Sequence, residues 1–157
     1  MAINPRIAYA VAAATAIAVP AEGLRQVAYR DPPGVLTVCY GETHNVDPHK
    51  VYSIDECKAL LSASMLKAVE TVEYCQPGLP VHVLAAFGDA VYNLGPTIAC
   101  DPKRSTAARL LKAGQYADAC MQLVRWDKAR IAGVMVKLPG LTKRRNRETQ
   151  LCMRGFA

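Results

Sequence analysis

The chain has 157 residues, which is enough for one domain or for two small lobes that share a core. Hydrophobic residues make up 52% of the chain and charged residues 20%, a balance that excludes a disordered chain and a protein with several membrane spans. The formal net charge of +6 favours an anionic partner, such as an acidic wall polymer, a lipid surface or a nucleic acid. Because aromatic residues are only 6% of the chain and are not interleaved with basic residues, no nucleic-acid partner is expected.

An uncharged, alanine-rich stretch, Ile7–Val19, lies close to the amino terminus. As a helix, residues 7–21 would extend about 22 Å, which is shorter than the roughly 30 Å hydrocarbon core of a bilayer. Three interpretations compete: a signal peptide cleaved after residues 16–18, a helix of the soluble core, and a temporary membrane anchor. Cleavage would leave Glu22 near a frayed new terminus, so we favour a segment that is not cleaved.

The rest of the chain predicts one short strand followed by helices. Residues 35–40 alternate, are rich in β-branched residues and are bounded by glycines, which predicts a strand in a small hairpin region. The capping box that begins at Ser53 opens a long helix to about Glu73. Four more helices are expected: one from Pro80 to Gly95, one from Ser105 to Gly114, one to about Val124, and one that begins at Thr142.

Six cysteines are dispersed along the chain without a C-x-x-C pair, so we expect no metal site. An even, dispersed set favours disulfides formed in an oxidising compartment, and six reduced buried thiols are the alternative. A Cys57–Cys75 bridge is not expected, because the helix between these residues would span about 27 Å. We expect local bridges Cys39–Cys57 and Cys100–Cys120, which leaves Cys75–Cys152 by elimination.

Two carboxylates stand near the predicted strand. Glu22 follows the apolar segment, and Asp31 lies in the loop before the strand that contains Thr37. A glycosidase needs one carboxylic acid to protonate the leaving oxygen and a second carboxylate to stabilise the sugar cation or to activate water. Partial burial would raise the pKa of Glu22, whereas Asp31 in a polar loop would stay ionised. The spacing alone is a weak signal, because surface carboxylates occur at such spacings by chance.

The surrounding sequence strengthens this signal. The segment EGLRQVAYRDPPGVLTVCYGET, which contains Glu22, Asp31 and Thr37, resembles the catalytic signature of the phage T4-type lysozymes, glycoside hydrolase family 24. Three later segments resemble the same family in the same order, so that the resemblance covers nearly the whole chain: AAFGDAVYNLGP, STAARLLKAGQYADAC and LPGLTKRRNRETQLC.

The resemblance implies an α+β fold that is mostly α, with two lobes and a cleft between them. The apolar segment would occupy residues 1–21 and the lysozyme catalytic domain residues 22–157. Within that domain, a small β-hairpin lobe would occupy about residues 22–58 and a larger helical lobe about residues 59–157.

The resemblance also implies a reaction, which is hydrolysis of the β-1,4 bond between N-acetylmuramic acid and N-acetylglucosamine in peptidoglycan. Members of the family usually invert the anomeric centre, so Glu22 would be the general acid, Asp31 the base and Thr37 the residue that positions the attacking water. No cofactor is expected, and the protein would act as a monomer. Many members have histidine where this chain has Glu42, so the supporting role of that histidine does not carry over.

Basic residues cluster at the expected start of the last helix, where cations are unfavourable for the helix dipole. By the resemblance, either Arg144 or Arg145 would reach the active-site carboxyls, and the sequence does not choose between them. A solvated basic face is the alternative explanation.

The apolar segment resembles the signal-arrest-release (SAR) segment of some phage endolysins. By this resemblance the protein would be exported, held in the host inner membrane through residues 7–21 and then released into the periplasm. The alternatives to hydrolysis are a lytic transglycosylase, which forms an anhydro product, and a non-catalytic lysis protein that binds the wall or the membrane.

Overall fold

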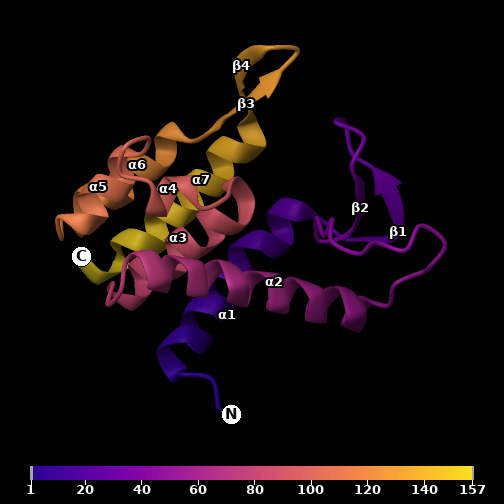
Figure 1. Ribbon diagram of the computed structural model, residues 1–157, viewed down its shortest axis with the longest axis horizontal. Helices are drawn as coiled ribbons and strands as arrows, with labels where there is room; N and C mark the ends of the chain where they lie inside the picture. The colour runs from indigo at the N-terminus through magenta and orange to yellow at the C-terminus, as the bar shows by residue number, and fades with distance from the viewer. Residues whose placement is uncertain (1, 157) are drawn as a thin grey trace.

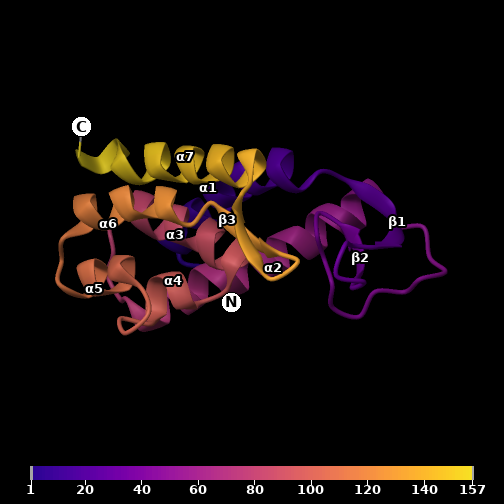
Figure 2. The same cartoon turned by 90° about the horizontal axis from the view of Figure 1, so that it is seen from above.

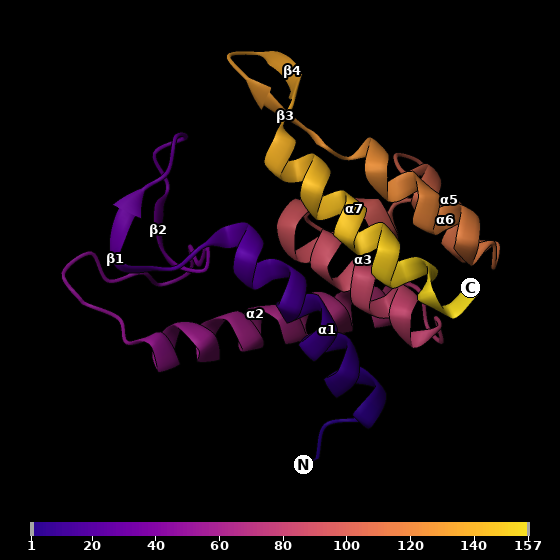
Figure 3. The same cartoon turned by 180° about the vertical axis from the view of Figure 1, so that it is seen from behind.

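The computed structural model describes residues 2–156, which form a body of helices with two separate β-hairpins. Figures 1 and 3 show the helices gathered around α3 (Val81–Leu94), and the first hairpin near one end of the long helix α2 (Ile54–Cys75). The other elements in chain order are α1 (Pro5–Glu22), β1 (Arg25–Arg30), β2 (Leu36–Cys39), α4 (Thr97–Cys100), α5 (Thr106–Lys112), α6 (Tyr116–Gln122), the 3-10 helix η1 (Leu123–Arg125), β3 (Lys128–Ile131), β4 (Val134–Lys137), α7 (Pro139–Met153) and the 3-10 helix η2 (Arg154–Phe156).

Helix α3 is the centre of the core, since every residue from Val83 to Val91 is buried. Figure 2 shows α7 on one side of α3 and α2 on the other, and α1 also packs on α3. Gly88 permits the close approach of α2, because a Cβ at this position would lie 2.7 Å from Cγ2 of Val69. Asp89 is a charged residue within this buried run and therefore requires a buried partner.

Helix α1 contains the apolar segment near the amino terminus. Asn4 caps its first turn by accepting a hydrogen bond from the backbone N–H of Arg6 at 2.8 Å. The helix packs against α3 and α2 and ends at Glu22, so the segment is a core helix in this structure. Within the described residues, no helix is both long enough and apolar enough to cross a bilayer. The buried face of α1 is mainly alanine: Ala10, Ala14, Ile17 and Ala18.

The first hairpin confirms the strand that was predicted at residues 35–40. Strands β1 and β2 pair antiparallel, and Tyr29 lies opposite Thr37. Asp31 closes the turn between them: its backbone N–H donates to the Val35 carbonyl at 3.0 Å, and its Oδ1 accepts from the Val35 N–H at 2.7 Å. These two bonds fix the position of the Asp31 carboxylate. The proposed lobe boundary at about residue 58 stays a prediction.

One of the three expected disulfides is confirmed. Cys39 in β2 is bonded to Cys57 in the first turn of α2, with a Cα–Cα distance of 4.9 Å. This bridge ties the first hairpin to the helix that begins after it. The capping box at Ser53, which starts that helix, is present as expected, with Glu56 as its second member.

The other two expected pairings are wrong. The structure joins Cys75 to Cys100 and Cys120 to Cys152, instead of Cys100 to Cys120 and Cys75 to Cys152. The short helix α4 ends at Cys100 and packs against α2, which places Cys100 beside the end of α2. Helix α6 packs against α7 and brings Cys120 to Cys152. Nearness in sequence was therefore a poor guide to these two bridges.

A second hairpin, β3–β4, occupies a region where only helix was expected. Its turn contains Ala132 at φ 49° and Gly133 at φ 82°. Two successive left-handed residues match the type I′ turn that joins tightly paired strands. The hairpin projects away from the helices in Figure 1.

Helix α7 also begins earlier than expected, at Pro139 rather than at Thr142. Proline is favourable at the first helical position, because its missing N–H would have no partner there. Lys143 and the arginines that follow it therefore lie beyond the first turn, and the argument from an unfavourable helix dipole does not apply to them.

Candidate active site

The carboxylate of Glu22 lies at the carboxyl end of α1, where the side chain is 23% exposed. Arg144 of α7 donates a hydrogen bond from Nη1 to Glu22 Oε1. Of the two arginines expected near the active-site carboxyls, Arg144 is the one that reaches Glu22. The ion pair joins the first helix, α1, to the last long helix, α7, which are far apart in the sequence.

Asp89 holds Arg144 from the opposite side. Arg144 Nε donates to Asp89 Oδ2 at 2.9 Å, and Nη2 donates to Oδ1 at 2.8 Å. The side chains are 3% and 0% exposed. Burial lowers the pKa of Arg144, but Asp89 and then Glu22 raise it more, so the pKa lies above the usual value for arginine. Asp89 thus determines which way the guanidinium points.

Gly41, just after β2, lies against the other oxygen of the Glu22 carboxyl. Its φ of +86° is in the left-handed region, and a Cβ at this position would be 2.9 Å from Glu22 Oε2. A larger residue would therefore be strained in its backbone and would also displace the carboxyl. Glycine is needed here for both reasons.

A pocket of about 280 Å³ adjoins the Glu22 carboxyl. Tyr92 lines it and donates from its hydroxyl to the Tyr40 carbonyl at 2.8 Å. Burial, together with the charges of Glu22 and Glu42, raises the pKa of Tyr92, so that this hydroxyl keeps its proton. The other lining residues are Gly41, Glu42, Thr43, Ser64 and Asn93.

Glu42, at the position noted in the sequence for its departure from histidine, has well-defined partners in this pocket. Its Oε2 accepts from Ser64 Oγ at 2.7 Å, and its Oε1 accepts from the backbone N–H of His44 at 3.0 Å. A second carboxylate therefore lines the same pocket as Glu22. Sequence reasoning assigned it no role.

Asp31 and Thr37 lie in the first hairpin and do not line the Glu22 pocket. Asp31 is partly exposed, whereas Thr37 is buried and donates from its hydroxyl to the Val35 carbonyl at 3.0 Å. Among the described residues, no hydrogen bond or ion pair joins either side chain to Glu22. The structure thus brings Glu22 and Arg144 into contact, whereas Asp31 and Thr37 lie in the first hairpin and, within residues 2–156, form no hydrogen bond or ion pair with either of them.

Arg145 points elsewhere, into the buried space between α7 and α3. Its Nη2 donates to Asn93 Oδ1 at 2.6 Å and to Glu148 Oε1 at 2.9 Å. Both Arg145 and Glu148 are fully buried. Arg145 therefore forms a buried ion pair with Glu148 and makes no hydrogen bond or ion pair with Glu22.

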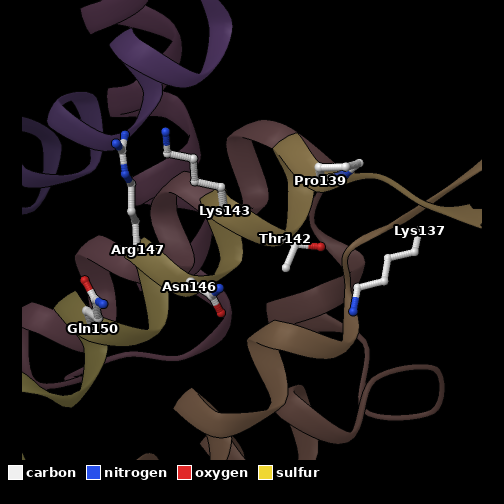
Figure 4. Close-up of a pocket in the computed structure, with 7 residues that line it drawn as sticks. All are labelled: Lys137, Pro139, Thr142, Lys143, Asn146, Arg147 and Gln150. Carbon is white, nitrogen blue, oxygen red and sulfur yellow. The ribbon is translucent and has the colours of Figure 1, made fainter.

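A larger hollow, of about 670 Å³, lies on the outer face of α7 and does not include Glu22 (Figure 4). Lys143 and Arg147 extend from successive turns of α7 toward the same side. Asp127 at the base of the hairpin accepts from Thr142 Oγ1 at 2.7 Å, which lowers the pKa of the Asp127 carboxyl. Three basic side chains, those of Lys137, Lys143 and Arg147, line this hollow. Within residues 2–156, no cluster of three or more metal-binding side chains is found.

The sequence of this chain is similar to those of known proteins. The family described as Phage lysozyme matches residues 20–148 of the chain. A SAR-endolysin of Bacteriophage PS119 is 38% identical over 136 residues, which cover 85% of this chain and 77% of that protein.

Two solved structures share the fold. The active form of the P1 phage endolysin Lyz superimposes with a TM-score of 0.79 at 24% identity, covering 92% of this chain and 85% of that one. The muramidase domain of SpmX from Asticaccaulis excentricus gives a TM-score of 0.77 at 25% identity, with 92% and 94% covered. The arrangement of helices and hairpins is therefore shared with these proteins.

Proposed function

Because the chain belongs to the phage lysozyme family, and is therefore a glycoside hydrolase that degrades peptidoglycan, we propose that Glu22 is its general acid. The expected lysozyme-like fold is confirmed by the solved structures. The observation that supports the role of Glu22 is its carboxyl, which Arg144 orients at the edge of an open pocket.

The contact between Arg144 and Asp89 bears directly on this role. A general acid has to carry a proton, and an unopposed arginine beside Glu22 would favour its ionised form. Asp89 offsets the charge of Arg144 through two hydrogen bonds. Arg144 can therefore hold the Glu22 carboxyl in place while Asp89 balances the charge of the guanidinium.

The second half of the proposal is that Asp31 is the base and Thr37 the residue that positions the attacking water. The turn hydrogen bonds of Asp31 hold a partly exposed carboxylate in one orientation, and Thr37 lies on the strand that follows it. An inverting reaction requires two carboxyls about 6.5–9.5 Å apart, with the water between them. The bond cleaved would be the β-1,4 bond between N-acetylmuramic acid and N-acetylglucosamine.

Product analysis of digested peptidoglycan tests the reaction. We expect muropeptides with a reducing N-acetylmuramic acid end, and proton NMR of the first products should show the α-anomer, because a β bond is inverted. An anhydro end would instead identify a lytic transglycosylase. A first-formed β-anomer would contradict the assignment of Asp31 as a base that activates water.

We also propose that the protein is exported, held transiently in the inner membrane by residues 7–21 and released as a monomer into the periplasm. The support is the similarity to a SAR-endolysin and the presence of disulfides, which form in oxidising compartments. While α1 was in the membrane, Glu22 would be held beside the bilayer, away from Arg144.

Cell fractionation tests this proposal. Before lysis, the protein should be found in the membrane fraction at its full length, and at the onset of lysis it should appear in the periplasmic fraction. A protein that is found only in the cytosol, or that has lost its amino-terminal segment, would contradict the proposal.

A further inference from the structure

The hairpin β3–β4 carries an apolar face that the rest of the molecule leaves largely uncovered. The hairpin extends beyond the helices in Figures 1 and 3, and every residue of β4 is exposed. Its register pairs Ile131 with Val134 and Ala129 with Val136. Residues that lie directly opposite each other in an antiparallel ribbon share a face, and successive residues of a strand alternate between faces. These four aliphatic residues therefore form one face of the hairpin, which we call the aliphatic face.

The aliphatic face is well exposed for its composition. Ile131 is 49% exposed, Val134 is 62% exposed and Val136 is 37% exposed. Single exposed apolar side chains are ordinary, whereas several on one face of a ribbon form a patch, and such patches mark interaction surfaces. A two-stranded hairpin is also only marginally stable unless one of its faces is packed. Both arguments indicate a partner that covers this face.

The opposite face of the hairpin is cationic. Lys128 lies directly opposite Lys137, and Arg130 is on the same face. Like charges directly opposite each other are unfavourable in a ribbon. Lys137 Nζ lies 3.6 Å from Asp127 Oδ2, but no ion pair of Lys128 or Arg130 is found within the part of the chain that the structure describes. From β3 to β4 the hairpin has three cationic side chains and no acidic one, so its charge favours an anionic partner.

The cationic side chains continue from the hairpin onto α7. Lys137 of β4 lines the hollow of Figure 4 together with Lys143 and Arg147 of α7. Cations therefore extend along the base of the hairpin, whereas Ile131 and Val134 flank its turn. A partner that matches both features has to offer apolar groups and negative charges side by side.

The surface of a bilayer with anionic phospholipids offers this combination. Amphipathic segments with a basic polar face lie in the membrane interface, with the apolar face toward the acyl chains and the cations at the phosphates. Anionic lipids strengthen such binding by attracting each nearby lysine or arginine. The long side chains of these residues can reach the phosphates even when their backbone lies deeper.

Two other occupants match the hairpin less well. Four small aliphatic side chains offer far less area than the roughly 800 Å² per partner of a typical stable interface, and cations on both strands disfavour pairing with the edge of a second copy. A glycan chain is polar, so covering aliphatic side chains with it would leave its hydroxyls without hydrogen-bond partners.

We propose that the β3–β4 hairpin docks on the surface of a bilayer that contains anionic phospholipids, with its aliphatic face against the acyl chains and its cations at the phosphates. This contact is separate from the proposed transient anchor at residues 7–21, because it is made while α1 is packed in the core. It leaves the Glu22 pocket free, since none of the residues that line the pocket belongs to the hairpin. It does not rest on the proposed catalytic roles.

Binding of the full-length protein to lipid vesicles tests the proposal. We expect the wild type to bind vesicles of phosphatidylethanolamine and phosphatidylglycerol about tenfold or more tightly than vesicles of phosphatidylcholine alone. Lys128→Gln/Arg130→Gln should remove most of this difference.

Val134→Thr/Val136→Thr should weaken binding to the anionic vesicles by about tenfold, because two side chains that enter the apolar region become polar. Threonine keeps the shape of valine and its preference for strands, so the hairpin should persist.

Val27→Thr/Val51→Thr is the matched control, since it makes the same change at two exposed valines of the first hairpin region. It should leave vesicle binding unchanged, and circular dichroism of all variants should match that of the wild type.

Several results would overturn the proposal. They are a wild type that does not bind the anionic vesicles, binding that the hairpin variants leave unchanged, and an equal loss of binding in the control. A wild-type dimer that Val134→Thr/Val136→Thr dissociates in sedimentation equilibrium would instead identify a second copy as the partner. If the hairpin variants lost binding to isolated sacculi but kept vesicle binding, the partner would be the wall polymer. None of these measurements depends on whether Glu22 is the general acid.

Discussion

Replacing Glu22 by glutamine is expected to lower the rate of peptidoglycan hydrolysis by about 10²–10⁴-fold, the contribution typical of a general acid. Glutamine has nearly the same shape and can still accept a hydrogen bond from Arg144 Nη1, but it cannot protonate the leaving oxygen. The fold should persist, because Asp89 still holds Arg144. Turbidity loss of permeabilised Gram-negative cells, together with release of soluble muropeptides, measures the effect.

The matched control is Glu70→Gln on the exposed side of α2, which makes the same chemical change away from the pocket and should keep full activity. Circular dichroism and thermal unfolding of both variants exclude a folding defect. If Glu22→Gln retained more than about a tenth of wild-type activity, Glu22 would not be the general acid.

Arg144→Ala is expected to lower the free energy of unfolding by about 3–5 kcal/mol, the usual effect of removing one partner from a buried ion pair. Arg144 is 3% exposed, and its loss leaves the fully buried Asp89 without its two strongest donors. Glu22 would also lose the donor that orients it. Urea unfolding followed by circular dichroism gives the change in free energy.

Lys143→Ala tests whether this effect is specific to the ion pair. Lys143 is the exposed neighbour of Arg144 on α7, and its removal should change the stability by no more than about 0.5 kcal/mol. The double variant Arg144→Ala/Asp89→Ala should be less unstable than the sum of the single variants, because it leaves no unpaired buried charge. Additive effects would show that the two side chains act independently.

The strongest local signals in the sequence predicted the helices well. The capping box at Ser53 starts α2, and the apolar stripe between Pro80 and Gly95 forms α3 with the expected end. Ser105 caps α5 as expected. In each case, side chains within one or two turns determine the structure, so a single sequence contains the needed information.

Features that depend on distant contacts were predicted less well. Cys100 pairs with Cys75 because the short helix α4 returns the chain to α2, and no local pattern marks that return. The hairpin β3–β4 did leave a local signal, which the prediction of a helical chain did not use: Gly133 stands between Ile131 and a strand that contains Val134 and Val136.

The candidate site shows the same difference between features that local sequence predicts and features that depend on distant contacts. The resemblance of the sequence to lysozymes indicated Glu22 and left Arg144 and Arg145 as alternatives, which only the packing of α7 on α1 and α3 resolves. Asp89 had a usable signal, since a charged residue in the middle of an apolar helix requires a buried partner. The sequence marked Gly41 only as a residue that bounds the predicted strand, because the close approach of the Glu22 carboxyl comes from another element and leaves no local pattern.

The alanine face of α1 restricts how the sequence of this protein can change. Ala10, Ala14 and Ala18 are fully buried, so a larger apolar residue at any of them would collide with the helices packed there. Those substitutions are also the ones that would make the segment more apolar and, on the proposal of a transient membrane anchor, slower to leave the bilayer. Selection for tight packing and selection for timely release would therefore act in the same direction, toward small side chains.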